Sequence, residues 1–331
     1  MKIKVKPLFL KQLLGVSIIM LSALCSYADE VEIPFKSGNL ILSGSLITPK
    51  GDGPFPVVIF IHGSGPEDRS NSRSRAKEFA KNGIAAFIYD KRGVGRSEGD
   101  KNFPNYFSID TLAQDANAAA DMLMDRLEIK NDKIGFVACS QGGWVAPLAA
   151  ALNNHISFMV IVSGSVSTIA EDNYFERDAR LRSEGFTDEE VKEADAMHLV
   201  DMELSRRGKN FDEFVAMWNK YKSAKWFKRV YVSEDPNPAD SKYRQWYRTV
   251  LDVDPRPSLA TLNIPILWLY GDATLDRFCP VELSLKNLDE LKKSGKAYQV
   301  ITFPGANHSL LKKSKDCLLE DEIFVWLNSK L

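Results

Sequence analysis

The chain has 331 residues, of which 44% are hydrophobic and 26% are charged. These are ordinary values for a globular protein, and the length is enough for one α/β domain that carries an insertion. The formal net charge of −1 argues against nucleic acid or an anionic membrane surface as the partner.

The first 28 residues have the pattern of a secretory signal peptide. Four lysines and no acidic residue lie within positions 1–11, an apolar run follows over 13–24, and Ser26 and Ala28 supply small residues at the cleavage positions. The apolar run is too short for a membrane-spanning helix. We therefore expect export to the periplasm or the medium, a mature chain that begins at Asp29, and no stable membrane insertion after cleavage.

Three cysteines remain beyond that segment, at Cys139, Cys279 and Cys317. An odd number in an oxidising compartment does not favour a disulfide framework, although it permits one pair. The spacing of these cysteines fits no zinc site. We expect neither a metal nor a cofactor.

The mature chain is predicted to begin with an antiparallel hairpin. Apolar and polar residues alternate over 31–35 and 39–48, on either side of Lys36-Ser37-Gly38. A connector rich in proline and glycine then leads to a continuous apolar run over 57–61, typical of a strand buried on both faces. That strand ends in the sequence His62-Gly-Ser-Gly-Pro66.

A helix predicted over 74–82 and a buried strand over 84–89 precede a glycine-rich loop from Asp90 to Gly99. The glycines follow the spacing Gly93-x-Gly95-x-x-x-Gly99, which is one residue longer than the dinucleotide-binding fingerprint, and no P-loop Gly-Lys-Ser/Thr follows. We interpret this loop as structural. An alanine-rich amphipathic helix is expected over 109–126, packed on the sheet.

A strand that turns abruptly into a helix is predicted around Ser140. Residues 133–139 form a short apolar run, and the small residues Ala138, Gly142 and Gly143 leave room for a strained turn that holds one side chain out from the sheet. The backbone N–H of Gln141 would lie in the first turn of the helix, where donors are unpaired and the helix dipole is positive. That N–H is placed to stabilise an oxyanion. Taken alone, the same residues also fit an ordinary capping serine.

The character of the sequence changes between 165 and 255. A strand is predicted over 158–162, and after it apolar residues become sparse while aromatic and charged residues increase. Helix-spaced patterns recur here over 188–204, 211–222 and 241–250. Buried strands are predicted again over 264–270 and 298–303, and an amphipathic helix over 316–331 ends the chain.

Four motifs together resemble those of the α/β-hydrolase superfamily, in particular its exported bacterial serine esterases and dienelactone-hydrolase-like branch. They stand in the family's order: HGSGP at 62–66, YDKRGVGRS at 89–97, SQGG at 140–143 and FPGANH at 303–308. One departure is that Ala138 replaces the first glycine of Gly-x-Ser-x-Gly. The resemblance implies an α/β-hydrolase fold, with a mostly parallel eight-stranded sheet, helices on both faces and a helical cap insertion.

The resemblance also implies how the chain is divided. We expect the signal peptide at 1–28, the first part of the hydrolase core at 29–164, the cap at 165–255 and the second part of the core at 256–331. Aromatic residues of the cap, such as Trp218, Trp226 and Trp246, could line an acyl pocket, but we expect them to serve mainly in the packing of the cap.

Site residues follow from the same motifs. Ser140 would be the nucleophile and His308 the general base, and the order serine, acid, histidine is that of the α/β-hydrolases. By the same resemblance, the backbone N–H groups of Ser64 and Gln141 would form the oxyanion hole. His62 is interpreted as structural, because it precedes a glycine turn at a strand end. His155 and His198 are interpreted as surface residues.

The acid of the triad is predicted to be Asp276, with Asp272 as the alternative. Asp272 is nearer to the strand end. Asp276 stands four residues before Pro280, as in the family's Asp-x-x-Val-Pro pattern, with Cys279 in place of the valine.

These residues predict an exported serine carboxylesterase that cleaves small-molecule esters, short acyl chains above all, through an acyl-enzyme intermediate. A serine peptidase or acyl-peptide hydrolase of the prolyl-oligopeptidase type is the alternative among enzymes. A catalytically inactive binding protein on the same scaffold is the alternative outside them. The sequence leaves the oligomeric state open.

Overall fold

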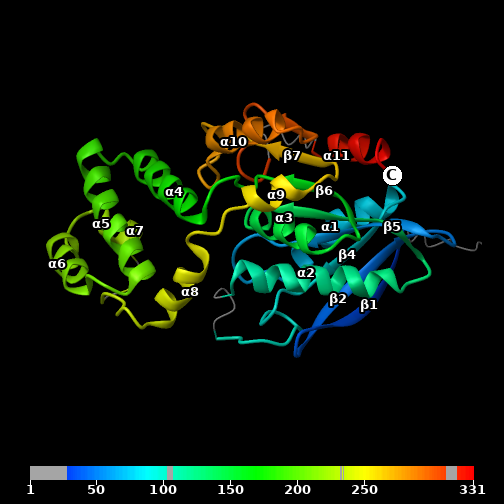
Figure 1. Ribbon diagram of the computed structural model, residues 1–331, viewed down its shortest axis with the longest axis horizontal. Helices are drawn as coiled ribbons and strands as arrows, with labels where there is room; N and C mark the ends of the chain where they lie inside the picture. Colours follow the sequence, from blue (N-terminus) through cyan, green and yellow to red (C-terminus); the bar gives the residue numbers. More distant parts are fainter. Residues whose placement is uncertain (1–27, 103–106, 232, 234, 311–318) are drawn as a thin grey trace, which may run out of the picture.

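The computed structural model describes residues 28–331, apart from 103–106, 232, 234 and 311–318. In this part of the chain one sheet of eight strands forms the centre, in the order β1-β2-β4-β3-β5-β6-β7-β8 (Figure 1). The mostly parallel eight-stranded sheet predicted from the sequence is confirmed.

Antiparallel pairing is confined to one side of the sheet. β1 (Ala28–Ser37) and β2 (Leu40–Pro49) form the predicted hairpin, and β2 also pairs antiparallel with β4 (Ala85–Tyr89). All other neighbours are parallel. The remaining strands are β3 (Phe55–Ile61), β5 (Ile129–Cys139), β6 (Ile156–Val162), β7 (Ile266–Tyr270) and β8 (Tyr298–Thr302).

Alternate residues of the central strands face two separate apolar cores. In β3, Val57 and Ile59 belong to one core, whereas Val58 and Phe60 belong to the other. The first core is covered by α2 (Ile109–Met124), α3 (Gly142–Leu152), α9 (Arg256–Thr261) and α10 (Val281–Lys293). The second is covered by α1 (Ser70–Lys81) and α11 (Leu319–Asn328). Burial on both faces explains why these strands are continuous apolar runs in the sequence.

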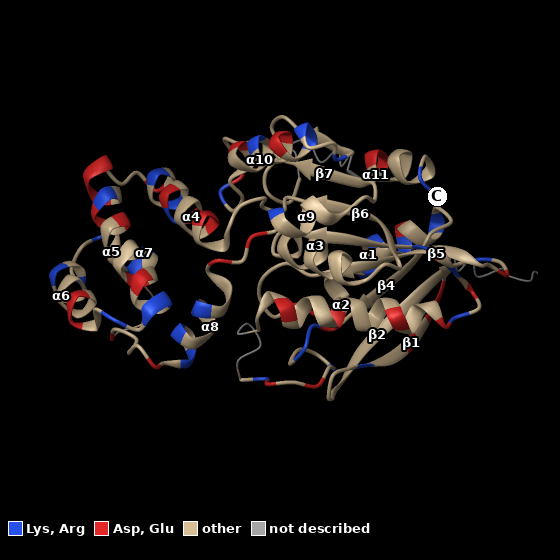
Figure 2. Cartoon of the chain, viewed as in Figure 1, with Lys and Arg blue, Asp and Glu red and all other residues tan. Residues whose placement is uncertain are grey.

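The chain between β6 and α9 forms a helical section beside the sheet (Figure 1). It has its own apolar cluster, which includes Phe214, Trp218 and Trp226. We propose that this section is the cap predicted over 165–255. Its helices are α4 (Ile169–Ser183), α5 (Asp188–Arg207), α6 (Phe211–Tyr221), α7 (Phe227–Val230) and α8 (Lys242–Val250). Acidic and basic residues are mixed along α4, α5 and α6, as expected for solvated faces (Figure 2).

Four helices were not predicted from the sequence, namely α4, the short helices α7 and α9, and α10. α4 lies where no helix was predicted, and it begins with a capping box in which Thr168 and Glu171 exchange hydrogen bonds. α10 follows the predicted acid loop. The helix predicted over 74–82 begins earlier, at Ser70.

None of the helices in the described part of the chain is long and apolar enough to cross a membrane. The predicted signal peptide lies outside the described residues, except for Ala28.

Candidate functional site

The backbone of Ser140 adopts a conformation that is rare for a residue with a side chain. Its φ angle is 50°, in the left-handed region, at the junction between β5 and α3. The Ser140 N–H donates to the carbonyl of Val162, at the end of the neighbouring strand, over 3.0 Å. Strained single residues of this kind concentrate at functional sites, and this strand-to-helix turn has the geometry expected of a nucleophile elbow.

Glycines beside Ser140 are required by close packing. A Cβ on Gly142 would lie 3.0 Å from the Cβ of Ala138 and 3.1 Å from the carbonyl oxygen of Ile61. A Cβ on Gly143 would lie 2.6 Å from the Cα of Gly164. The start of α3 therefore rests against the ends of the neighbouring strands, which accounts for the small residues in the motif.

Asp276 and His308 are brought together from the loops after β7 and β8. The Nδ1 atom of His308 lies 2.9 Å from Oδ1 and 3.0 Å from Oδ2 of Asp276, whose side chain is buried. Oδ1 also accepts from the backbone N–H groups of Phe278 and Cys279. A proton on Nδ1 satisfies this contact and leaves Nε2 as the acceptor, which is the tautomer that a general base needs.

Asp272, the alternative acid, has a different set of partners. Its carboxylate accepts from the hydroxyl and the backbone N–H of Thr274 and from the backbone N–H of Gly305. These hydrogen bonds lower the pKa of Asp272, the Thr274 hydroxyl being the largest cause. Asp272 thus connects two loops, and the acid in contact with His308 is Asp276.

A hydrogen bond from the residue after β6 holds the loop that carries His308. The hydroxyl of Ser163, the residue after β6, donates to the backbone carbonyl of His308 over 2.7 Å. The ring of Phe278 contacts the imidazole edge to face, with the ring centroids 5.3 Å apart. These contacts hold the imidazole in one orientation.

The other three histidines are placed differently. His62 contacts the carbonyl of Tyr89 through Nε2 at 2.7 Å, and burial lowers its pKa to about 3, as suits a structural residue. His155 is exposed, as predicted. The prediction for His198 was wrong: it is 8% exposed, because its helix α5 packs against α4 and α8.

Ser140, His308, Ser64 and Gln141 line one cavity of about 520 Å³. Its opposite wall comes from the helical section, with Ile169, Asp172, Asn173 and Glu176 on α4 and Trp246 and Val250 on α8. Four of the five predicted site residues therefore share a cavity, and Asp276 lies behind His308. Trp218 and Trp226 are packed within the helical section as expected, whereas Trp246 borders the cavity.

Acidic residues of this cavity were missed by the sequence analysis. Asp172 and Glu176 lie one turn apart on α4, and Glu67 lies in the loop after β3. Burial raises the pKa of Asp172 to about 8 and also raises the pKa of Glu176 and Glu67. The capping box at Thr168 was the available signal, since it predicts a helix with these residues on one face.

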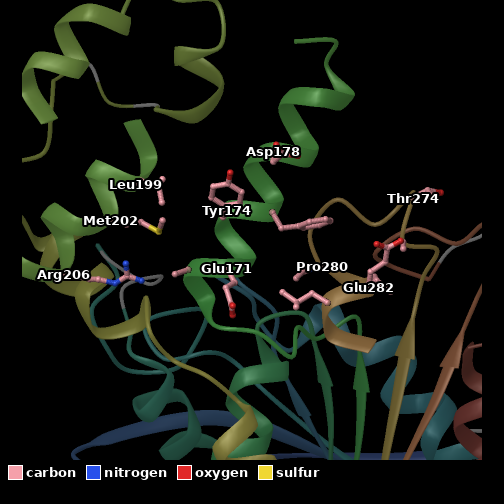
Figure 3. Close-up of a pocket in the computed structure, with 14 residues that line it drawn as sticks. Glu171, Tyr174, Asp178, Leu199, Met202, Arg206, Thr274, Pro280 and Glu282 are labelled. Carbon is pink, nitrogen blue, oxygen red and sulfur yellow. The ribbon is translucent and has the colours of Figure 1, made fainter. Parts of the chain in front are cut away.

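A second cavity of about 710 Å³ lies on the other side of α4 (Figure 3). Its walls are Tyr174 and Phe175 on α4, Leu199 and Met202 on α5, and the start of α10 near Pro280. None of the predicted site residues is among the described residues that line it. Helix α4 thus has one face on each cavity.

Cys139, next to Ser140, lacks the environment of a reactive thiol. Burial raises its pKa to about 11, which disfavours the thiolate. Cys139 and Cys279 are free, and Cys317 lies outside the described residues. In the described part of the chain, no cluster of three or more His, Cys, Asp or Glu side chains is arranged to hold a metal.

A family model for hydrolases, described as serine aminopeptidase, S33, matches residues 52–315. The chain belongs to this family. It is therefore a hydrolase of the α/β-hydrolase superfamily, as the four motifs predicted.

One curated relative is the esterase EstD of Thermotoga maritima, which is 29% identical over 114 residues. The match covers 32% of this chain and only 26% of that protein. Among solved structures, DcsB in complex with its substrate analogue has a TM-score of 0.62 at 18% identity and covers 92% of this chain and all of its own. A dienelactone hydrolase from Anabaena variabilis has a TM-score of 0.55 at 15% identity, with 92% and 99% covered. At these identities the two structures support the fold alone.

The two aspartates give a direct test of the site. Asp276→Asn should lower kcat by orders of magnitude, because an amide at this position favours the wrong imidazole tautomer. Asp272→Asn is the matched control and should retain most of the activity. Steady-state kinetics on an activated ester measure both variants, and the reverse ranking would transfer the role to Asp272.

Proposed function

We propose that this protein is a serine hydrolase that cleaves carboxylic esters of small molecules, with short acyl chains preferred. The observation that carries the proposal is the Asp276–His308 contact beside a cavity that Ser140 also lines. The strained backbone of Ser140 supports the same conclusion, because it presents the hydroxyl to that cavity.

In the proposed reaction, the Ser140 oxygen attacks the ester carbonyl while Nε2 of His308 takes its proton. His308 then gives the proton to the departing alcohol, and water hydrolyses the acyl-enzyme by the same steps. Asp276 holds the imidazole and stabilises its charged form. The amides of Ser64 and Gln141 would stabilise the tetrahedral oxyanion.

The volume of the cavity and the helices that line it limit the size of the proposed substrate. The cavity has a volume of about 520 Å³, and α4 and α8 cover the edge of the sheet where open α/β folds bind ligands. A cavity of this size beneath two helices disfavours folded proteins and bulk lipid, so we expect acyl chains of roughly two to six carbons to be favoured. The names of two similar proteins, an esterase and a dienelactone hydrolase, agree with ester chemistry.

Chromogenic esters of graded acyl length test this proposal. We expect kcat/KM to be highest for acyl chains of roughly two to six carbons. Amides should react much more slowly, because an amine is a poorer leaving group than an alcohol. The Ser140→Ala variant supplies the background rate. Faster cleavage of long-chain triglyceride emulsions, or of a simple peptide amide, would contradict the proposal.

An aminopeptidase-like preference is the second candidate, and Asp172 favours it. Asp172 is 6% exposed and lines the cavity of Ser140. Its Oδ1 has no hydrogen-bond partner among the described residues. Burial raises the pKa of this carboxyl, but a substrate ammonium group beside it would favour the ionised form and could pair with this oxygen. The family is described as serine aminopeptidases.

A matched pair of substrates separates the two candidates. If Asp172 binds an ammonium group, wild-type enzyme should prefer a free aminoacyl ester to its N-acetylated form. Asp172→Asn should then lower kcat/KM on the free aminoacyl ester by roughly tenfold or more, with little change on the acetylated one. Equal loss on both would assign Asp172 to the structure of the cavity alone.

Export is part of the proposal and rests on residues 1–28. Their lysine-rich start, apolar run and small residues support a cleaved signal peptide. A periplasmic or extracellular location follows from it.

A further inference from the structure

Lys91 is a buried cation directly behind the proposed oxyanion hole. It is the second residue after β4 and is only 3% exposed. Its Nζ atom lies 2.9 Å from the carbonyl oxygen of Gly63, 3.2 Å from that of Gly65 and 2.8 Å from Oε1 of Gln141. An ammonium group has three N–H donors, and here it has three acceptors.

These acceptors belong to both halves of the proposed oxyanion hole. The carbonyl of Gly63 and the N–H of Ser64 are parts of one peptide group, and in a planar trans peptide they point in opposite directions. A hydrogen bond from Lys91 to the Gly63 oxygen therefore fixes the direction of the Ser64 N–H. The third bond holds the side chain of Gln141, whose backbone N–H is the other proposed donor.

Charge adds to this geometric effect. A hydrogen bond from an ammonium group is stronger than one between neutral groups, and a polarised peptide is a better donor at its other end. The buried positive charge of Lys91 lies at the carbonyl end of the peptide whose other end is the Ser64 N–H. Its electrostatic potential therefore adds to that of the N–H at the position of an oxyanion.

We propose that Lys91 is the positioning residue of the oxyanion hole, which orients and polarises the Ser64 amide and ties it to Gln141. This inference rests on the proposed serine hydrolase function. Lys91 acts through the two amides and does not touch the reacting atoms.

The loop around Lys91 is built to hold it in place. The preceding residue, Asp90, accepts hydrogen bonds from the backbone N–H groups of Arg69 and Arg96. A Cβ on Gly95 would lie 2.7 Å from Oδ2 of Asp90, so the loop needs a glycine there. The N–H of Lys91 donates to the carbonyl of Glu67.

In the described part of the chain, the titratable groups that face Lys91 are Glu67 and His62, both in the segment after β3. Burial lowers the pKa of Lys91 to about 8, and the carboxylate of Glu67 opposes this shift. His62, with its pKa lowered to about 3, is neutral over the working range. Lys91 is therefore charged below about pH 8. Above that pH it loses its charge and one N–H donor, so kcat should fall as the pH rises through about 8.

Substitution of Lys91 tests the inference, with its neighbour Arg92 as the control. Lys91→Met should lower kcat on a short acyl ester by about 100-fold or more, with KM changed by no more than about threefold. Arg92 pairs with the buried carboxylate of Asp115 and lies over the ring of Phe107, and neither of these partners is a proposed site residue. Arg92→Met should therefore lower the melting temperature while kcat stays close to wild type.

Lys91→Arg provides a second test that does not depend on the folding of the methionine variant. A guanidinium stays charged at all working pH values, but its planar fork cannot reproduce the three bonds of an ammonium group. We expect a lower kcat than wild type and no fall near pH 8. Wild-type kcat in Lys91→Arg, an unchanged alkaline fall, or a kcat for Lys91→Met equal to that of Arg92→Met would each overturn the inference. A wild-type enzyme inert toward every ester would overturn the proposed function itself, and the inference with it.

Discussion

The left-handed backbone of Ser140 is the constraint on which the site depends. A non-glycine residue in this region costs about 1–3 kcal/mol, so the surrounding structure has to hold it. The bond from Ser140 N–H to Val162 and the close approach of Gly143 to Gly164 supply that support. Any side chain at position 143 would push α3 away from β6. Gly142 and Gly143 thus allow α3 to begin with only two residues between it and the end of β5, and this places Ser140 in the turn between them.

The parallel sheet then gathers the other groups at the same edge. The carboxyl ends of parallel strands lie together, so the loops after β3, β4, β5, β7 and β8 meet although they are far apart in the sequence. This brings Ser64, Lys91, Ser140, Asp276 and His308 from five loops into one region. α4 and α8 line this region opposite the strand ends, so they limit the volume that the proposed site offers a substrate.

Local chemistry explains what could be predicted from the sequence. The elbow at Ser140 and the loop at His308 are short segments whose glycines and strand ends can be recognised without tertiary information, and the spacing to Pro280 favoured Asp276. Lys91 could not be predicted in this way, and for Asp172 the capping box at Thr168 predicts only the helix and not its place beside Ser140. The acceptors of Lys91, and the residues that share the cavity with Asp172, come from segments distant in the chain. His198 was misjudged for the same reason, because α4 and α8 bury a helix that looks solvated in the sequence.

Covalent labelling by a fluorophosphonate is the most direct measurement of the central claim, that Ser140 is an activated nucleophile. The reagent bonds to a serine oxygen only where a base removes its proton and the developing charge is stabilised. Mass spectrometry of the digested wild-type protein should find one phosphonyl group, on Ser140, and Ser140→Ala should remain unlabelled while Cys139→Ala is labelled like wild type. An unlabelled wild-type protein, or a label on another residue, would contradict the account and favour an inactive binding protein or a different nucleophile.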